Sequence, residues 1–262
     1  SDDKKLILFG SGRFTERFLF EFAGDYSIYS IVDNNSAKWG TTMAGIPVNS
    51  PDILREIPES ERHIIICIKG YNGVVNQLKD MGIADYHIYD PGNDYPNKSK
   101  EHVAQSLAQT SDSGLKESDM DKPYNVGYIA GVFDLFHVGH LNMFKRAKEQ
   151  CRYLIVGVVS DEGVRLNKQA EPFVPFEERI EMVRSCRYVD EAVKLPLNFA
   201  GTRDMFKKYH FDVQFSGSDY EHDPGWLAEK EFLEKNGSTM VFFPYTQSTS
   251  STKLKKAIEG RA

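Results

Sequence analysis

An apolar run from Asn125 to Val132 leads directly into a turn with two histidines, and this junction constrains the fold more than any other segment. The run predicts a buried strand, and Leu141 to Gln150 predicts a helix. His137 and His140 therefore fall between a strand end and a helix start. In a parallel α/β sheet this position binds phosphates, because unpaired backbone N–H groups and the helix dipole favour negative charge there. Gly139 lets the backbone approach a ligand closely, and both imidazoles can donate hydrogen bonds to a phosphoryl oxygen.

The turn is one of four sequence blocks that together resemble a known family. Residues 131–140, GVFDLFHVGH, resemble the HxGH signature of the nucleotidyltransferase superfamily, specifically its cytidylyltransferase branch. The other blocks follow in the family's order: Tyr153–Glu162, Pro175–Arg179 with Arg187–Glu191, and Tyr245–Lys253, which is similar to the family's RTEGIST-type loop. HxGH alone is weak evidence, but four ordered blocks over the last half of the chain are specific. The likeness is to glycerol-3-phosphate cytidylyltransferase-like enzymes in particular, and it implies a Rossmann-like catalytic domain.

Composition narrows the class of protein further. The net charge of -6 and the pI near 5.7 argue against a general nucleic-acid binder, although a local pocket can still bind one nucleotide. Cys67, Cys151 and Cys186 lack the spacing of a metal site, which predicts reduced cysteines in a packed core. No apolar run approaches the roughly 20 residues that span a bilayer, and Ser1 to Lys5 lacks a signal-peptide core. We therefore expect a cytoplasmic protein without a membrane span.

A change of composition between Asp94 and Lys122 predicts two domains. Pro, Ser, Lys, Asp and Gln dominate this stretch, in which Val103 to Ala108 is compatible with a short helix. The predicted fold class is α/β, with two Rossmann-like parallel-sheet domains joined by a polar linker. The predicted boundaries are 1–95 for the N-terminal domain, 96–123 for the linker and 124–262 for the catalytic domain.

The N-terminal half carries the pattern of a βαβ series, hence of a parallel sheet. Apolar strands are predicted at Leu6–Phe9, Ser27–Val32, His63–Ile68 and Tyr86–Tyr89, with an amphipathic helix ending near Phe22. Gly10, Gly12 and Asp33 are similar to a dinucleotide or nucleotide-sugar fingerprint, but Thr15 stands in the place of the third glycine. The segment from Asp33 to Val48 resembles the small Rossmann-like domain that precedes some sugar acyltransferases, where it holds a nucleotide sugar. A nucleotide-type ligand and a vestigial or interaction module both remain open for this domain.

The family resemblance implies a reaction and the residues that carry it. A cytidylyltransferase joins a phosphorylated alcohol to CTP: the substrate phosphate attacks the α-phosphorus, and pyrophosphate leaves without a covalent enzyme intermediate. Such transfers depend on positioning and on stabilising charge in the transition state. His137 and His140 would contact the α-phosphate and its bridging oxygen. Lys168, in a polar stretch before Pro175, would bridge the phosphates of both substrates; a solvated loop lysine is the alternative.

Further residues receive roles by the same resemblance. Asp134 is expected to shape the turn by accepting backbone N–H groups. Arg187 and Asp190 would shape and organise the site, with a structural ion pair as the alternative, and Asp219 follows the predicted strand Asp212–Phe215 at the carboxyl end of the sheet. Arg179 and Arg203 would meet the second substrate's phosphate. The nucleotide site would also include Val132, Phe133, Asp134, Gly139 and Gly217.

The final loop is predicted to cradle phosphates. Thr246, Ser250, Ser251 and Thr252 offer hydroxyls ahead of a predicted helix at Lys253–Ile258, which Ser251 or Thr252 would cap. Tyr245 is assigned to the nucleotide site but stands where the family has arginine, so Lys253, Arg187 or a metal would have to meet the triphosphate charge. Mg²⁺ is expected with the nucleotide, through substrate oxygens and water. No protein metal site and no zinc cluster are predicted.

The leading hypothesis is a CTP-dependent cytidylyltransferase that acts on a small phosphorylated alcohol, with glycerol 3-phosphate as first choice. Phosphocholine, phosphoethanolamine and phospho-amino compounds remain open as substrates. An adenylyltransferase that uses ATP and a non-catalytic nucleotide-binding regulator also remain open. The attached N-terminal domain associates the chain with bacterial surface-polysaccharide synthesis of the capsule or teichoic-acid type. CTP and the phosphorylated alcohol are the expected partners, without nucleic acid, and the resemblance implies a homodimer.

Overall fold

The computed structural model describes residues 4–112, 121–195, 201–244 and 251–260 of the 262-residue chain. The chain divides into two compact units, Ser1–Ser99 and Lys100–Ala262, each built on a largely parallel sheet. The predicted class, α/β with two Rossmann-like domains, is confirmed. Helix α4, Lys98–Asp112, lies within the predicted linker and is longer than the short helix expected there. No helix of the described residues is long and apolar enough to span a bilayer.

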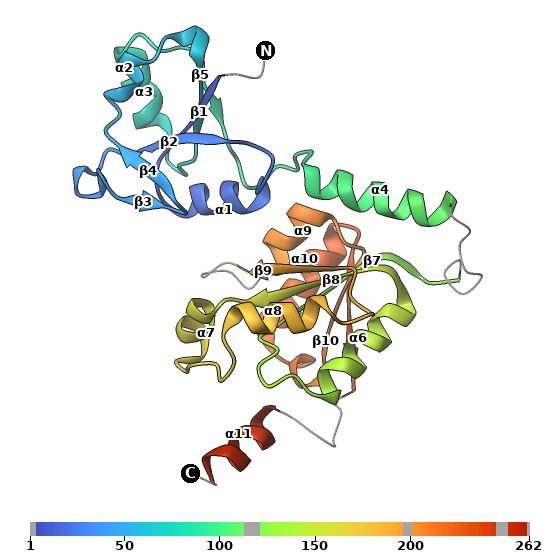
Figure 1. Cartoon of the computed structure of the whole chain (residues 1–262). Coiled ribbons are helices and arrows are strands. Elements are labelled where there is room, and N and C mark those ends of the chain that lie inside the picture. The colour runs from blue at the N-terminus through green and yellow to red at the C-terminus, as the bar shows by residue number, and fades with distance from the viewer. Residues whose placement is uncertain (1–3, 113–120, 196–200, 245–250, 261–262) are drawn as a thin grey trace. The chain divides into compact units, whose positions relative to one another are not determined.

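Unit 1 contains a six-stranded sheet in the order β3-β4-β2-β1-β5-β6 (Figure 1). Its strands are β1 Lys5–Phe9, β2 Ile28–Val32, β3 Thr42–Met43, β4 Ile46–Asn49, β5 Arg62–Ile66 and β6 His87–Ile88. All neighbours are parallel except β3 and β4, which form an antiparallel hairpin. The sequence pattern did not predict this hairpin. It turns at Ala44 and Gly45, which both adopt positive φ, 51° and 78°.

Apolar residues on both faces of the unit 1 sheet explain why helices cover both. Ile7 and Phe9 of β1 pack with Leu54, Val74 and Leu78, which belong to α2 (Ile53–Glu56) and α3 (Asn72–Asp80). Leu8 points to the opposite face, in a cluster with Phe18 of α1 (Arg13–Glu21). The alternation along β1 therefore builds two separate cores. Two short 3₁₀ helices complete the unit, η1 Ser36–Lys38 and η2 Glu59–Glu61.

Unit 2 contains a five-stranded, all-parallel sheet in the order β11-β10-β7-β8-β9 (Figure 1). Its strands are β7 Tyr124–Gly131, β8 Cys151–Val159, β9 Glu191–Leu195, β10 Val213–Gly217 and β11 Thr239–Phe243. The chain runs outward from β7 to β8 and β9, then returns to β10 on the other side of β7. The strand order therefore reverses between β7 and β10, and open α/β sheets bind ligands at the carboxyl ends of the strands at such a point.

Helices follow the strands of this sheet, and several of them supply the first turns that surround the reversal point. They are α6 Val138–Gln150, α7 Asp161–Lys168, α8 Phe176–Arg184, α9 Thr202–Tyr209, η3 Ser218–Tyr220, α10 Pro224–Lys235 and α11 Ser251–Glu259. Phe144 of α6 and Val183 of α8 are fully buried in one cluster with Leu154 and Val156 of β8. These contacts fix α6, and with it the histidine turn, against the sheet.

Candidate active site

A cavity of about 470 Å³ opens at the carboxyl end of the unit 2 sheet. Its lining comes from the end of β7, the first turns of α6, the helix α7, the end of β10, η3, α10 and the start of α11. It collects many of the residues predicted for the site: Val132, Phe133, His137, Gly139, His140, Lys168, Gly217, Asp219, Ser251 and Thr252. Segments far apart in the sequence thus meet at the predicted edge of the sheet.

The two histidines form a reciprocal cap on α6. The backbone N–H of Gly139 donates to Nδ1 of His137 over 3.0 Å, and the backbone N–H of His137 donates to Nδ1 of His140 over 3.4 Å. Their ring centroids lie 3.9 Å apart. Because this cap satisfies N–H groups of the first turn, α6 begins at Val138, earlier than the predicted start at Leu141.

This geometry makes both imidazoles hydrogen-bond donors toward the cavity. An Nδ1 atom that accepts a hydrogen bond is unprotonated, so the neutral ring carries its proton on Nε2. Burial lowers the pKa of His137. Burial, together with the nearby His137 ring, lowers the pKa of His140 to about 4, against the opposing effect of Asp134. Near neutral pH, both rings are therefore neutral with the proton on Nε2, which in His137 faces the Ser251 hydroxyl at 3.2 Å.

The turn before the histidines has a strained backbone conformation that packing must stabilise. Phe133 and Leu135 have positive φ, 54° and 49°, which non-glycine residues rarely adopt. The Phe133 ring lies against Gly131, where a Cβ atom would be 2.6 Å from it, and meets the His140 ring edge-on at 5.3 Å. Strain of this kind costs on the order of 1–3 kcal/mol per residue. The packing of Phe133 holds the turn and the His140 ring together.

Asp134 ties two other segments to this turn. Its carboxylate accepts the backbone N–H groups of Phe173 and Val174, over 3.1 and 3.0 Å, and lies 2.8 Å from the Lys255 ammonium on α11. Burial alone would raise the pKa of Asp134, but these partners outweigh it and hold the pKa below its usual value. Asp134 does not line the cavity. It accepts backbone N–H groups as predicted, but from residues 173 and 174, and the sequence pattern gave no role to Lys255.

Ser251 connects α11 to the histidines themselves. Its Oγ donates to the carbonyl oxygen of Asp134 over 2.9 Å and lies 3.2 Å from Nε2 of His137. Ser251 is the first residue of α11. Tyr245, Thr246 and Ser250 lie outside the described residues. Lys168 is the last residue of α7, at a helix end instead of in the predicted loop, and it lines the cavity.

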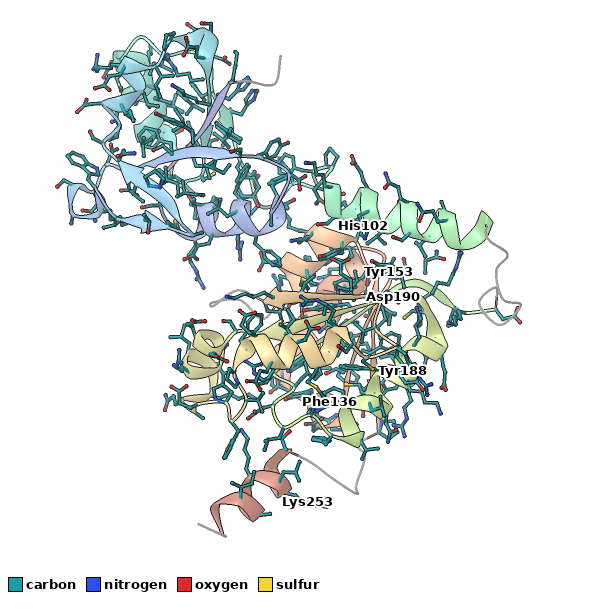
Figure 2. All side chains as sticks on the ribbon, viewed as in Figure 1. His102, Phe136, Tyr153, Tyr188, Asp190 and Lys253 are labelled. Carbon is teal, nitrogen blue, oxygen red and sulfur yellow. The ribbon has the colours of Figure 1, made fainter. Side chains whose placement is uncertain are left out.

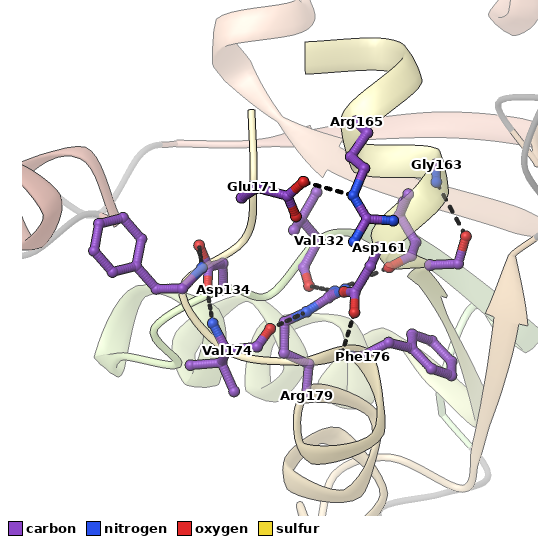
Figure 3. A network of polar contacts seen from close by, with 12 residues as sticks. Val132, Asp134, Asp161, Gly163, Arg165, Glu171, Val174, Phe176 and Arg179 are labelled. Carbon is purple, nitrogen blue, oxygen red and sulfur yellow. Dashed lines mark hydrogen bonds and ion pairs between the residues drawn. The ribbon is translucent and has the colours of Figure 1, made fainter. Parts of the chain in front are cut away.

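Arg179 does not lie in the cavity, and its prediction as a substrate ligand is corrected by its contacts (Figure 3). Its side chain is fully buried and pairs with the Asp161 carboxylate at 2.6 Å. It also donates to the carbonyl oxygens of Val132, Val159 and Val174. A guanidinium with all these partners holds the ends of β7 and β8 together and has no surface to offer a substrate.

Arg187 and Asp190 also lie outside the cavity. Asp190 accepts the backbone N–H of Leu154 over 2.6 Å and pairs with Lys148 at 2.5 Å. Arg187 is exposed and stacks over the Tyr188 ring, 5.1 Å from its centroid. These contacts match the structural role considered for Asp190 and place neither residue beside the nucleotide.

Arg203 and Lys253 are likewise outside the cavity lining. Arg203 pairs with Glu229 at 3.1 Å and lies over the Phe232 ring at 4.8 Å, which holds it on the surface of α10. Lys253 is an exposed residue of α11 (Figure 2). Neither position supports a direct contact with a substrate in the cavity.

The cavity also contains residues that the sequence pattern did not single out. Arg146 of α6 lines it and donates to the carbonyl oxygen of Pro244 over 2.9 Å. Tyr220 and Trp226 line it together, with ring centroids 4.7 Å apart. The one available signal was position: Tyr220 directly follows the Gly217–Asp219 segment at the end of β10.

Among the described residues, a metal ion at the cavity would find few protein ligands. The described residues contain no group of three or more His, Cys, Asp or Glu side chains that could hold a metal ion. Asp219 is the one carboxylate among the described residues of the cavity lining. A Mg²⁺ ion coordinated mainly by phosphate oxygens and water needs no more than this.

In unit 1, the predicted ligand residues are engaged with one another. The Asp33 carboxylate accepts the N–H and the hydroxyl of Ser11, over 2.8 and 2.5 Å, and the N–H of Asn35 over 2.8 Å. Burial would raise the pKa of Asp33, but these bonds outweigh it and lower the pKa. Gly10 has φ 103°, and a Cβ there would lie 2.5 Å from Ile68. Gly10 and Asp33 thus close the turn, and Gly12 caps α1.

Comparison with known proteins places unit 2 in a family. The cytidylyltransferase-like family model matches residues 128–257. An FAD synthase of Thermococcus kodakarensis is 38% identical over 135 residues, which cover 50% of this chain and 87% of that protein. A glycerol-3-phosphate cytidylyltransferase of Bacillus subtilis is 33% identical over 130 residues, 50% of this chain and 94% of that protein. An ethanolamine-phosphate cytidylyltransferase of Dictyostelium discoideum is 44% identical over 93 residues, 35% of this chain and 26% of that protein. The chain belongs to the cytidylyltransferase-like family of nucleotidyltransferases.

Proposed function

We propose that unit 2 transfers CMP from CTP to the phosphate of a small phosphorylated alcohol, with glycerol 3-phosphate as first choice, and releases pyrophosphate. The observation that carries the proposal is the histidine pair: two neutral rings at the start of α6, each with Nδ1 occupied, lie in one cavity with Lys168 and Thr252. The similarity to the B. subtilis glycerol-3-phosphate cytidylyltransferase supports the choice of substrate.

The proposed reaction uses the groups around the cavity for positioning and charge. An oxygen of the acceptor phosphate attacks the α-phosphorus of CTP, and the bond from that phosphorus to the bridging oxygen breaks, so pyrophosphate leaves. Nε2–H groups of His137 and His140 donate to the phosphoryl oxygens as negative charge shifts onto them. Lys168, on the β8 side of the cavity, neutralises the approaching acceptor phosphate. No proton transfer is required, because the acceptor oxygen is already anionic.

Arg146 is the proposed replacement for the arginine that Tyr245 displaces. Arg146 and Lys168 supply the Arg and Lys side chains among the described residues of the cavity lining. The hydrogen bond from Arg146 to the carbonyl of Pro244 places its guanidinium beside the start of the final loop. A guanidinium can bind two phosphate oxygens at once. Mg²⁺ bound to the triphosphate would neutralise further charge and polarise the phosphorus centre.

A second candidate is adenylyl transfer from ATP, and the similarity to an FAD synthase favours it. The two candidates differ in the nucleotide base and in the acceptor, so one experiment separates them. The full chain is incubated with Mg²⁺, each of the four NTPs, and a panel of glycerol 3-phosphate, phosphocholine, phosphoethanolamine and FMN. Mass spectrometry of the product identifies both halves. A CDP-linked product supports the first candidate, and FAD supports the second. Nucleotide binding with no product supports a regulator.

We further propose a cytoplasmic homodimer that serves bacterial surface-polysaccharide synthesis of the capsule or teichoic-acid type. A glycerol-phosphate product would suit such a polymer, and light scattering of the purified chain tests the dimer. For unit 1, the engaged carboxylate of Asp33 favours an interaction module over a nucleotide-sugar site. Calorimetry of the full chain with nucleotide sugars tests this choice.

A further inference from the structure

Two aromatic rings form one wall of the cavity. Tyr220 is the last residue of η3, directly after β10, and Trp226 lies in the first turn of α10. The rings stack at 29° with centroids 4.7 Å apart, and both line the cavity. Asp223 caps α10 by accepting the N–H groups of Gly225 and Trp226, over 2.8 and 3.1 Å. This cap fixes the backbone that carries Trp226.

These rings are large apolar surfaces that the protein core does not use. Tyr220 is 39% exposed and Trp226 is half-buried, whereas Phe211, Phe215 and Phe243 of the same unit are buried. Stacked rings at a cavity rim offer a flat, rigid face at little cost in side-chain entropy. Such a face suits a flat aromatic ligand, because stacking of a base on an aromatic side chain is favourable for every base.

The position of the wall indicates which part of a nucleotide it faces. The phosphate-binding groups, His137 and His140, come from the β7 side of the point where the strand order reverses. Tyr220 and Trp226 follow β10, on the other side of that point. A triphosphate held at the start of α6 can therefore extend its nucleoside across the β10 end. Gly217 lets the Asp219 carboxylate lie close to the backbone here, since a Cβ would lie 2.3 Å from one of its oxygens.

We infer that the Tyr220–Trp226 pair stacks against the nucleobase of the triphosphate substrate. This inference rests on the proposed nucleotide site, but not on the identity of the acceptor. Stacking is tolerant of the base, so the pair contributes affinity for CTP and ATP alike. The choice between them then falls to groups at the edge of the base. An ionised carboxylate accepts hydrogen bonds and donates none. Asp219, in the cavity lining, is therefore placed to accept from an exocyclic amino group or a sugar hydroxyl.

The experiment uses tryptophan fluorescence of the full chain without acceptor substrate. The chain has two tryptophans, so Trp39→Phe leaves Trp226 as the sole reporter. Mg²⁺–CTP should quench its emission saturably, whereas Mg²⁺ with inorganic tripolyphosphate should not. By calorimetry, Trp226→Leu should raise the Kd for CTP about tenfold, and Trp226→Phe should stay within about threefold of the unchanged chain. Leu227→Ala, an exposed neighbour on α10 outside the cavity, is the matched control and should leave the Kd unchanged.

Binding of tripolyphosphate in the Trp226→Leu variant reports whether the phosphate site is still folded. An unchanged tripolyphosphate Kd with a raised CTP Kd supports the stacking role. An equal loss of affinity for both ligands, or no loss of affinity for either, overturns the stacking role. If CTP quenches the fluorescence and tripolyphosphate does not, but no acceptor receives CMP, the stacking role stands and the proposed reaction is rejected. If the chain transfers CMP but Trp226→Leu has a normal Kd for CTP, the proposed reaction stands and the stacking role is rejected.

Discussion

The ammonium of Lys255 lies 2.8 Å from a carboxylate oxygen of Asp134 and joins helix α11 to the histidine turn. The Asp134 side chain is 4% exposed, so solvent screens this pair weakly. The neighbouring Ser251 hydroxyl, between the Asp134 carbonyl and His137, belongs to the same connection. The position of the histidine turn therefore depends on a helix more than a hundred residues further along the chain.

Lys255→Met should lower kcat with little change in folding of the sheet, because α11 loses its ion pair to the turn but keeps the hydrogen bond from Ser251 to the Asp134 carbonyl. We expect a loss of about tenfold, comparable to the removal of a group that orients a catalytic residue. Steady-state kinetics and circular dichroism measure the two effects. Lys256→Met, on the exposed side of the same helix, is the control. Equal activity of both variants would contradict the positioning role.

The same ion pair predicts a pH dependence of stability. The folded-state pKa of Asp134 is below its unfolded value, so its contribution is complete above the ordinary aspartate value of about 4. It should be lost as the pH falls from there through the lower folded pKa. Urea unfolding between neutral pH and pH 3 should show a smaller acid-induced loss in Asp134→Asn than in the unchanged chain. An identical pH profile would contradict the assigned contacts.

His140→Ala should lower turnover by more than about a hundredfold, as expected for removal of one donor to a developing negative charge. His102→Ala, an exposed position on α4, is the matched control and should leave turnover unchanged (Figure 2). Burial lowers the pKa of His140 to about 4, so the ring stays neutral as the pH falls through 6.5. The His140 contribution to stability is complete above about pH 6.5 and is lost as the pH falls toward 4. NMR titration of the ring checks the value, and a pKa near 6.5 would contradict the buried, neutral donor.

Arg179→Met should destabilise the protein by about 3–5 kcal/mol, because it leaves the buried carbonyl groups and Asp161 without their partner. Arg203→Gln, which removes an exposed ion pair, should change stability by less than about 1 kcal/mol. Urea unfolding compares the two variants. If Arg179 bound substrate instead, its loss would raise KM for the acceptor and spare the free energy of unfolding.

Arg146→Gln should raise KM for CTP by at least about tenfold and change kcat little, since a charge-assisted contact to phosphate is worth roughly 1.5–3 kcal/mol. Lys145→Gln, the exposed neighbour on α6, controls for the change of net charge. Initial rates at saturating acceptor measure both constants. A normal KM in Arg146→Gln would assign the triphosphate charge to another group.

The sequence predicted what local patterns determine. The apolar runs predicted β7 and β10 within a few residues, and the histidine turn was found because strand, turn and helix are contiguous. Pairs that depend on tertiary contact were not found. A buried arginine such as Arg179 and an exposed arginine look alike in sequence. Only the structure shows that the Arg179 guanidinium is already hydrogen-bonded to carbonyl oxygens at the ends of β7 and β8. Trp226 and Arg146 enter the cavity through helix orientation, which a sequence does not specify.

The central claim is that the histidine pair serves nucleotidyl transfer, and product analysis tests it most directly. The full chain, His140→Ala and His102→Ala are each incubated with Mg²⁺, CTP and glycerol 3-phosphate, and the products are identified by mass. We predict CDP-glycerol and an equal amount of pyrophosphate from the full chain and His102→Ala, and almost none from His140→Ala. Equal product from His140→Ala, or no CDP-glycerol from the full chain, would contradict the account.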